Sequence, residues 1–170
     1  EKGKVFFNGS DISNLPVYKR ISSGLGYTFQ ITSIFSNLTV YENVALSIKN
    51  RRDKEKRSIV FEVLNKVGLL DRVSQRSGDL SYGHQRLLEL AMGIAQRPKL
   101  LILDEPTQGL SDLEIENFKK LIKKISATVT VLLIEHNMDV VMSIADKITV
   151  LHFGEIIAEG DKKSIQHNPL

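Results

Sequence analysis

The segment that most constrains the fold is residues 100–106, which reads Leu-Leu-Ile-Leu-Asp-Glu-Pro. Four successive aliphatic residues, bounded by a proline, predict a short strand that is buried on both faces, as in parallel sheets. Asp104 and Glu105 then fall at the carboxyl end of this strand, where open α/β sheets bind their ligands. One carboxylate of such a pair can hold Mg²⁺ through water while the other accepts a proton. Alone, the run fits equally well a strand whose terminal acids are only solvated.

Composition narrows the class of protein. The chain has 170 residues, of which 42% are hydrophobic and 25% charged, as is typical of a globular domain with a real core. Its net charge of +3 is too small to indicate nucleic-acid binding. The sequence contains no cysteine, which excludes disulfides, thiolate metal sites and cysteine nucleophiles. Since no apolar run approaches the ~20 residues that cross a bilayer, we expect a cytoplasmic protein docked to a partner that spans the membrane.

Strand and helix signals alternate along the chain. The expected strands are residues 5–7, 24–29, 100–104 and 129–134, followed by a hairpin of 148–152 and 155–159. The expected helices are residues 34–47 with Thr39 as a possible N-cap, 59–70 with Gly68 as a C-cap candidate, 85–95, a stretch to about 126 that Ser111 or Asp112 caps, 138–145, and a short helix after Asp161. The helix that ends near 126 is expected to bury Phe118, Leu121, Ile122 and Ile125. Strands separated by helices predict an α/β fold with a mostly parallel sheet and right-handed crossovers.

Residues 49–57 carry six basic and two acidic side chains. Such a run is typical of a solvated helix face or loop. Contact with lipid head groups or with a partner protein is the alternative interpretation.

A polar turn at residues 80–84, Leu-Ser-Tyr-Gly-His, leads directly into an apolar helical pattern. Ser81 and Gly83 are therefore expected at a helix N-terminus, where unpaired N–H groups and the helix dipole favour anions. Gly83 would also let a phosphate approach the backbone closely. A plain serine-capped helix is the simpler alternative.

His136 follows the predicted strand 129–134, just as Glu105 follows the strand at 100–104. Parallel strands place their carboxyl ends at the same edge of a sheet, so Glu105 and His136 are expected to reach one ligand. A hydrogen-bonded surface histidine remains the alternative for His136 alone. Together with the helix start at Ser81, these residues indicate a phosphate-binding site that contains acids and a histidine.

At these motifs the chain resembles the nucleotide-binding subunit of an ATP-binding cassette (ABC) transporter, and the resemblance covers essentially the whole sequence. Residues 80–84 resemble the family signature, usually Leu-Ser-Gly-Gly-Gln. Residues 100–105, twenty positions on, resemble the Walker B motif with its catalytic glutamate. Gln30 resembles the Q-loop glutamine, residues 108–111 the D-loop, and His136 the switch histidine.

The resemblance implies a P-loop NTPase (RecA-like) fold with a mostly parallel sheet and an α-helical subdomain. The whole chain, residues 1–170, would be a partial, N-terminally truncated ATP-binding domain. Residues 1–31 and 91–170 would form portions of the RecA-like core. Residues 32–90 would form the helical subdomain, which ends in the signature motif and docks on the permease.

The resemblance also implies roles for single residues, with ATP and Mg²⁺ as cofactors. Asp104 would hold Mg²⁺ through water, and Glu105 would orient and deprotonate the attacking water. His136 would hold the γ-phosphate and position that water. Gln30 would take part in catalysis, sense Mg²⁺ and report to the membrane partner. Such positioning and charge stabilisation supply most of the catalysis of phosphoryl transfer.

The signature residues imply a dimeric working unit. Ser81, Tyr82, Gly83 and His84 would contact the nucleotide bound by the opposite subunit, and Ser111 would contribute from the D-loop. The partners would be a second ABC ATPase subunit, identical or different, and transmembrane permease subunits, with no nucleic acid. The protein would lie peripherally on the cytoplasmic face of the plasma (inner) membrane.

The sequence departs from the family pattern in three places. Tyr82 replaces the first signature glycine and His84 the final glutamine, and Ser111 stands at the acidic D-loop position with Asp112 one residue later. No G-x-x-x-x-G-K-[ST] occurs in the sequence, so no loop of this type cradles the β- and γ-phosphates. The chain also starts at Glu1 within a strand-like pattern. We therefore expect a fragment that lacks the Walker A region and that alone binds ATP poorly and does not hydrolyse it.

Residues 27–30, the signature tyrosine Tyr82 and residues 150–160 resemble the branch of importers for branched-chain amino acids and urea. The expected function is thus an ATP-hydrolysing subunit that powers an importer for such a small polar solute. The alternatives are a soluble ABC ATPase that acts on nucleic acid or ribosomes, and a non-catalytic cassette fragment.

Overall fold

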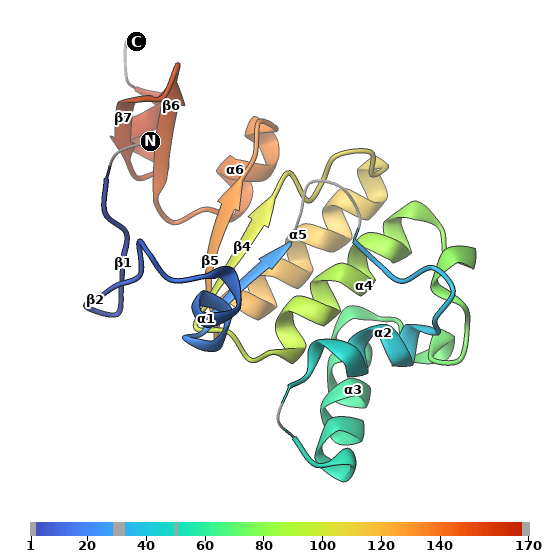
Figure 1. The fold of residues 1–170 in the computed structure, drawn as a ribbon. Coiled ribbons are helices and arrows are strands. Elements are labelled where there is room, and N and C mark those ends of the chain that lie inside the picture. The colour runs from blue at the N-terminus through green and yellow to red at the C-terminus, as the bar shows by residue number, and fades with distance from the viewer. Residues whose placement is uncertain (1–2, 29–32, 50, 168–170) are drawn as a thin grey trace.

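The computed structural model describes residues 3–28, 33–49 and 51–167 (Figure 1). Three parallel strands form the central sheet in the order β3 (Leu25–Thr28), β4 (Leu100–Asp104), β5 (Thr130–Ile134). In its register, Thr28 pairs with Leu103 and Asp104 pairs with Ile134. The three carboxyl ends therefore lie along one edge of the sheet, as the sequence predicts for an α/β fold.

Helices cover one face of this sheet. The helix α4 (Tyr82–Ala95) packs beneath β3 and β4, and α5 (Asp112–Ser126) packs beside it (Figure 1). Gly93 allows a close approach between α4 and β4, because a methyl group there would lie 3.1 Å from Cδ1 of Leu101. The buried residues of α5 are the expected ones, namely Phe118, Leu121, Ile122 and Ile125.

The opposite face of the sheet is not buried, and here the expectation of strands buried on both sides is wrong. Leu101 and Leu103 of β4 are buried, whereas Ile102 between them is only half-buried. On β5, Leu132 is 50% exposed and Ile134 is 47% exposed. The alternation arises because successive side chains point to opposite faces and α4 and α5 cover only one of these faces.

The helices α2 (Val40–Ser47) and α3 (Asp53–Val67) pack against α4 on the side away from the sheet. Helix α2 begins at Val40 within the expected segment, and the expected N-cap is confirmed, because Thr39 forms a capping box with Glu42. Helix α3 begins earlier than predicted and includes half of the basic run. The acids in its first turn stabilise this start by interacting with the helix dipole. Gly68 ends α3 in the left-handed conformation, at φ 79°, as expected.

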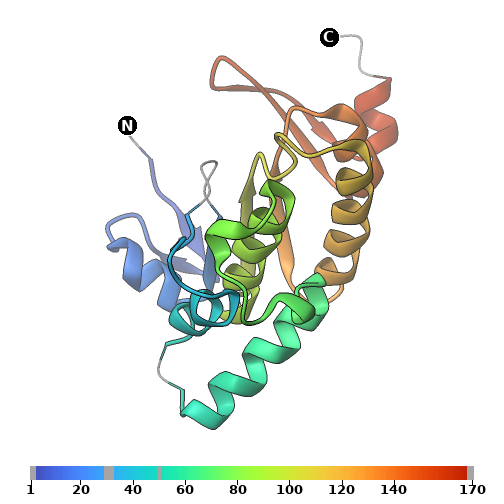
Figure 2. The same cartoon turned by 90° about the vertical axis from the view of Figure 1, so that its right-hand side faces the viewer.

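The remaining elements are small. They are β1 (Phe6–Phe7), β2 (Ser10–Asp11), α1 (Val17–Ser22), α6 (Met138–Ile144), β6 (Ile148–His152), β7 (Glu155–Gly160), α7 (Lys162–Gln166) and two 3₁₀ turns, Leu70–Arg72 and Ser77–Asp79. The β6–β7 hairpin and the α2–α3 pair lie at opposite ends of the molecule in both views (Figures 1 and 2). Within the described ranges, no helix combines the length and apolar character needed to cross a membrane.

Candidate functional site

Two polar side chains meet at the carboxyl edge of the sheet. The Glu105 N–H donates a hydrogen bond of 2.9 Å to the carbonyl oxygen of Ile134, which extends the pairing of β4 and β5 by one residue. His136 Nδ1 then lies 3.5 Å from Oε1 of Glu105. The Glu105 side chain is three-quarters buried, at 25% exposure, whereas the His136 side chain is 72% exposed. The structure thus brings the expected base and the expected switch histidine to one place.

The backbone of Glu105 is strained. Its φ is +44°, a left-handed conformation that costs a non-glycine residue about 1–2 kcal/mol. Three hydrogen bonds hold this conformation. Besides the bond to Ile134, the Glu105 carbonyl accepts from Nη2 of Arg86 at 3.0 Å and from the N–H of Gln108 at 3.2 Å. Strain that the surroundings over-determine in this way is typical of functional sites.

Asp104 has a partner that the motif comparison did not predict. The Tyr27 hydroxyl on β3 donates a hydrogen bond of 3.0 Å to Oδ2 of Asp104. This hydrogen bond to the carboxylate raises the pKa of Tyr27, and burial and the Asp104 charge act in the same direction. The interaction orients the carboxylate expected to bind magnesium.

The described residues contain no group of three or more His, Cys, Asp or Glu side chains that could hold a metal ion. A single carboxylate is enough for Mg²⁺, because proteins commonly bind this ion through one or two carboxylates while water and substrate phosphates complete its shell. Asp104 can supply one such carboxylate.

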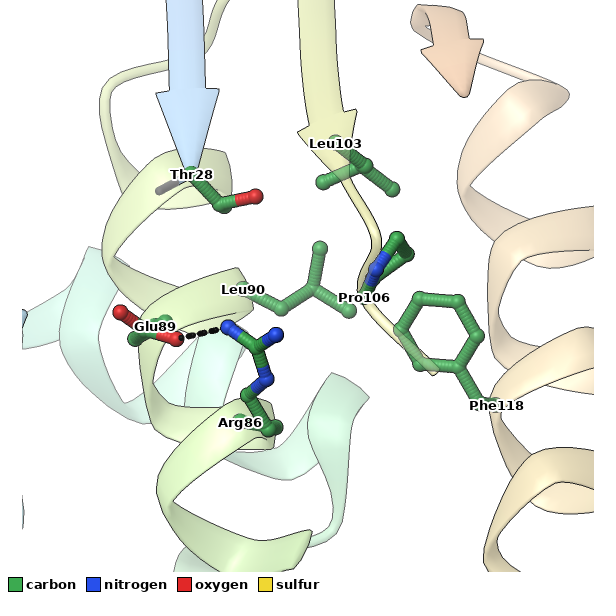
Figure 3. A pocket seen from close by; sticks show the side chains of 7 residues that line it. All are labelled: Thr28, Arg86, Glu89, Leu90, Leu103, Pro106 and Phe118. Carbon is green, nitrogen blue, oxygen red and sulfur yellow. Dashed lines mark hydrogen bonds and ion pairs between the residues drawn. The ribbon is translucent and has the colours of Figure 1, made fainter. Parts of the chain in front are cut away.

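A buried ion pair lies directly behind the strand tip. Arg86 and Glu89, one turn apart on α4, form a pair of 3.1 Å with side-chain exposures of 4% and 6%. Figure 3 shows the pair beside Thr28, Leu103 and Pro106 at the edge of a small pocket. Burial raises the pKa of Glu89, although hydrogen bonds from Ser33 and Arg86 oppose the shift.

The loop after Pro106 is fastened to β5 by Glu135, the residue before His136. Oε1 of Glu135 accepts from the Thr107 N–H at 3.0 Å and from the Thr107 hydroxyl at 2.5 Å. These two bonds join the segments that carry Glu105 and His136. The relative position of the two residues is therefore fixed by side chains as well as by the sheet.

The signature residues lie against the start of α5. Ser81 caps α4, with its hydroxyl 3.4 Å from the His84 N–H and 2.8 Å from His84 Nδ1. A methyl group at Gly83 would overlap the carboxylate of Glu114, which itself forms a capping box with Ser111 at the N-terminus of α5. The signature and D-loop residues thus form one surface.

Tyr82 lies close to the D-loop segment. A methyl group at Gly109 would approach Cε1 of Tyr82 to 3.0 Å, and Gly109 has a φ of +77°. This glycine is therefore required both for its conformation and for space. The tyrosine that replaces the family's signature glycine packs across the loop that carries Ser111.

Gln30 lies outside the described residues, so its position relative to this site stays a prediction. The residues that the sequence analysis missed are Tyr27, Arg86, Glu89 and Glu135. Each lies within or beside an identified motif, but Tyr27 and Glu135 have no spacing that indicates a contact. The buried pair on α4 did have a signal, because Arg86 and Glu89 interrupt an otherwise apolar helix at i,i+3 spacing.

Comparison with known proteins identifies the family. Residues 1–108 match the family model described as ABC transporter. The chain is 34% identical to the high-affinity branched-chain amino acid transport ATP-binding protein BraF of Pseudomonas aeruginosa, over 98% of this chain and 73% of that protein. It is 36% identical to the probable branched-chain amino acid transport ATP-binding protein LivG of Archaeoglobus fulgidus, over 99% and 72%. It is also 32% identical to the lipopolysaccharide export system ATP-binding protein LptB of Haemophilus influenzae, over 99% and 71%.

Solved structures agree with this assignment. An ATP-binding cassette of an ABC transporter superposes with a TM-score of 0.88 at 26% identity, covering 98% of this chain and 72% of that chain. CbiO1 of Clostridium perfringens, part of an ABC transporter complex, superposes with a TM-score of 0.87 at 25% identity, covering 97% and 68%. The expected P-loop NTPase fold is thereby confirmed. The chain belongs to the ABC transporter family, as an ATP-binding subunit whose ATPase activity is coupled to transport.

Proposed function

We propose that Asp104, Glu105 and His136 form the hydrolytic end of the ATP site. The observation that carries this proposal is the 3.5 Å approach of His136 to Glu105, whose strained backbone is fixed at the tip of β4. A carboxylate and an imidazole at this distance can share one water molecule between them. Asp104 precedes Glu105 and is oriented separately by Tyr27, so the two carboxylates can serve different partners.

The roles follow from these positions. Glu105 orients the attacking water and accepts its proton, and His136 donates a hydrogen bond on the phosphate side. Asp104 holds magnesium through water, with Gln30 as a further contact. When bound, Mg²⁺ neutralises charge on the phosphates. The chain itself contributes position, because the bonds to Ile134, Arg86 and Gln108 hold Glu105 in place before any ligand binds.

We further propose that the surface formed by α4 and α5 at their N-termini faces a second ATPase subunit. Ser81, Tyr82, Gly83 and His84 would contact the nucleotide of that subunit, and Ser111 would contribute from the D-loop. Tyr82 is 43% exposed and its backbone begins α4, so the N–H groups of the first turn can meet an anion. Co-expression of two differently tagged copies of this chain tests whether the partner subunit is identical or different.

Residues 32–90 are proposed as the helical subdomain that docks on the permease, and residues 1–31 and 91–170 as portions of the RecA-like core. Exposed apolar side chains support a docking role for α2 and the segment before it. Phe35 is 57% exposed and Leu46 is 58% exposed. A surface of this kind fits a protein partner, and docking would hold the chain at the cytoplasmic face of the inner membrane.

The proposed transported solute is a branched-chain amino acid, urea or a similar small polar solute. Two relatives named for branched-chain amino acid transport support this class. Other relatives are named for import of phosphate or methionine and for lipopolysaccharide export. Adding leucine, urea, phosphate and methionine in turn to the subunit reconstituted with its permease and binding protein tests the class. Stimulation of hydrolysis by leucine or urea supports the proposal, and stimulation by phosphate or methionine alone rejects it.

The metal-binding role is tested in the complete gene product with Asp104→Asn, with Asp112→Asn as the matched control at the start of α5. Hydrolysis is measured across a magnesium titration. We expect Asp104→Asn to raise the half-saturating magnesium concentration about 10- to 100-fold, the range for loss of a metal-site contact. Asp112→Asn should leave it unchanged. Equal magnesium requirements in both variants would show that Asp104 does not hold the metal.

A further inference from the structure

Arg86 connects helix α4, which begins in the signature residues, with Glu105 at the end of β4. Its guanidinium donates through Nη2 to the carbonyl oxygen of Glu105 and through Nη1 to Oε2 of Glu89. The side chain is 4% exposed, so both bonds are made out of contact with bulk water. Because the fork of an arginine is planar and rigid, its two ends fix the Glu105 carbonyl relative to α4.

Glu89 extends this connection toward the helical subdomain. Its second oxygen, Oε1, accepts a hydrogen bond of 2.5 Å from the Ser33 N–H. Ser33 begins the segment that leads into α2, and Asn43 of α2 holds this segment through the N–H of Phe35 at 2.8 Å. Asn43 is itself fully buried. Hydrogen bonds and the two-residue backbone between Ser33 and Phe35 therefore connect α2, through Glu89 and Arg86, to Glu105.

We propose that Arg86 is a positioning residue for Glu105, and that the Arg86–Glu89 pair transmits displacement of the Ser33 segment to the hydrolytic carboxylate. The inference rests on the proposed role of Glu105. The carbonyl that Arg86 holds belongs to the residue with a φ of +44°, so a shift of the guanidinium acts directly on the strained peptide. Docking of a permease on the helical subdomain would thus alter the position of the base.

A role in stability alone does not account for the pair. Replacing a buried ion pair with apolar side chains of similar volume is often neutral or stabilising, because desolvation offsets the attraction. The direction of the Glu89 pKa shift agrees, since burial outweighs the favourable contacts with Ser33 and Arg86. The hydrogen-bond geometry instead suits a rigid link between the Ser33 segment and the Glu105 peptide.

The test uses three variants of the complete gene product with its permease. Arg86→Lys keeps the positive charge but lacks the planar guanidinium that donates to Glu89 and to the Glu105 carbonyl at once. The double variant Arg86→Met with Glu89→Leu removes the link and leaves no unpaired buried charge. Arg97→Met is the matched control, because Arg97 follows the same helix and its exposed guanidinium pairs with Glu62 at 3.8 Å, away from Glu105.

We expect Arg86→Lys and the double variant to lower kcat about 10- to 100-fold, the range for misplacement of a catalytic group, while the KM for MgATP stays within about 2-fold. Stimulation by the permease should fall toward the basal rate in both. The double variant should be as stable to urea as the unmodified protein. Arg97→Met should change neither kcat nor stimulation.

Two results would overturn the inference. One is a double variant with normal kcat and normal permease stimulation. The other is an Arg86→Lys variant whose loss of rate matches its loss of folded protein. Failure of the proposed function is separately visible, because Glu105→Gln would then keep hydrolysing ATP. If Glu105→Gln is inactive and the double variant is normal, only the positioning role is rejected.

Discussion

Replacement of Glu105 by glycine should relieve backbone strain while removing activity. The left-handed backbone at φ +44° costs a glutamate about 1–2 kcal/mol, and glycine adopts it freely. Glycine loses more entropy on folding, which costs about 0.5–1 kcal/mol. The lost contact with His136 is worth less than about 0.5 kcal/mol, because His136 is 72% exposed.

Glu105→Ala is the matched control, because it also removes the partly buried carboxylate side chain but keeps the strained backbone. The difference between the two variants isolates the conformational contribution, and we expect Glu105→Gly to be the more stable by about 0.5–1 kcal/mol. For a domain of this size, this difference corresponds to about 1–4 °C in Tm.

The assay is urea unfolding followed by far-UV circular dichroism, with thermal melts of the same samples and with hydrolysis measured in parallel. Both variants should be inactive, so that stability and activity separate. A Glu105→Gly variant no more stable than Glu105→Ala would refute the reasoning that the site stores backbone strain.

Three further predictions concern its neighbours. Gly83→Ala should displace the Glu114 carboxylate from its capping box and cost about 1 kcal/mol in urea unfolding; with Glu114→Ala already present, the same change should stabilise, since alanine favours a helix. Tyr27→Phe should free the Asp104 carboxylate and raise the half-saturating magnesium concentration for hydrolysis about 10-fold. An unchanged magnesium titration would contradict this. Burial raises the pKa of Glu89, so above the ordinary carboxyl pKa of about 4.3 the folded state binds a proton that the unfolded state has lost. The contribution of Glu89 to the free energy of unfolding therefore falls as pH rises from about 4.3 to the pKa of Glu89 in the folded state. Glu89→Gln should remove that decline from stability measured between pH 4 and 7, and an identical slope in both proteins would show that Glu89 is not shifted.

The arrangement of the sheet could be predicted from the sequence because local and global signals agree there. The apolar run at residues 100–103 and the helices around it specify parallel strands, and the ends of β4 and β5 meet as expected. The exposure of the second face of the sheet could not be predicted. An apolar residue such as Leu132 has the same sequence signal whether or not another element covers it, and here it is 50% exposed.

The candidate site divides in the same way. Glu105 and His136 follow their strands directly, so their proximity follows from topology alone. The partners of Glu105 and Asp104 come from distant positions and depend on side-chain packing. Tyr27 reaches across from β3, and Arg86 reaches from α4 to a backbone carbonyl rather than to a motif side chain. No sequence spacing encodes such contacts.

The most direct test of the central claim is steady-state phosphate release by the complete gene product carrying Glu105→Gln. Glu116→Gln, which alters an exposed carboxylate of α5 that pairs with Lys119 and lies outside the proposed site, serves as the control. If Glu105 is the general base, its substitution should nearly abolish turnover while ATP still drives stable dimers, and the control should remain active. Turnover by Glu105→Gln at a rate comparable with the control would contradict the proposed assignment of the site.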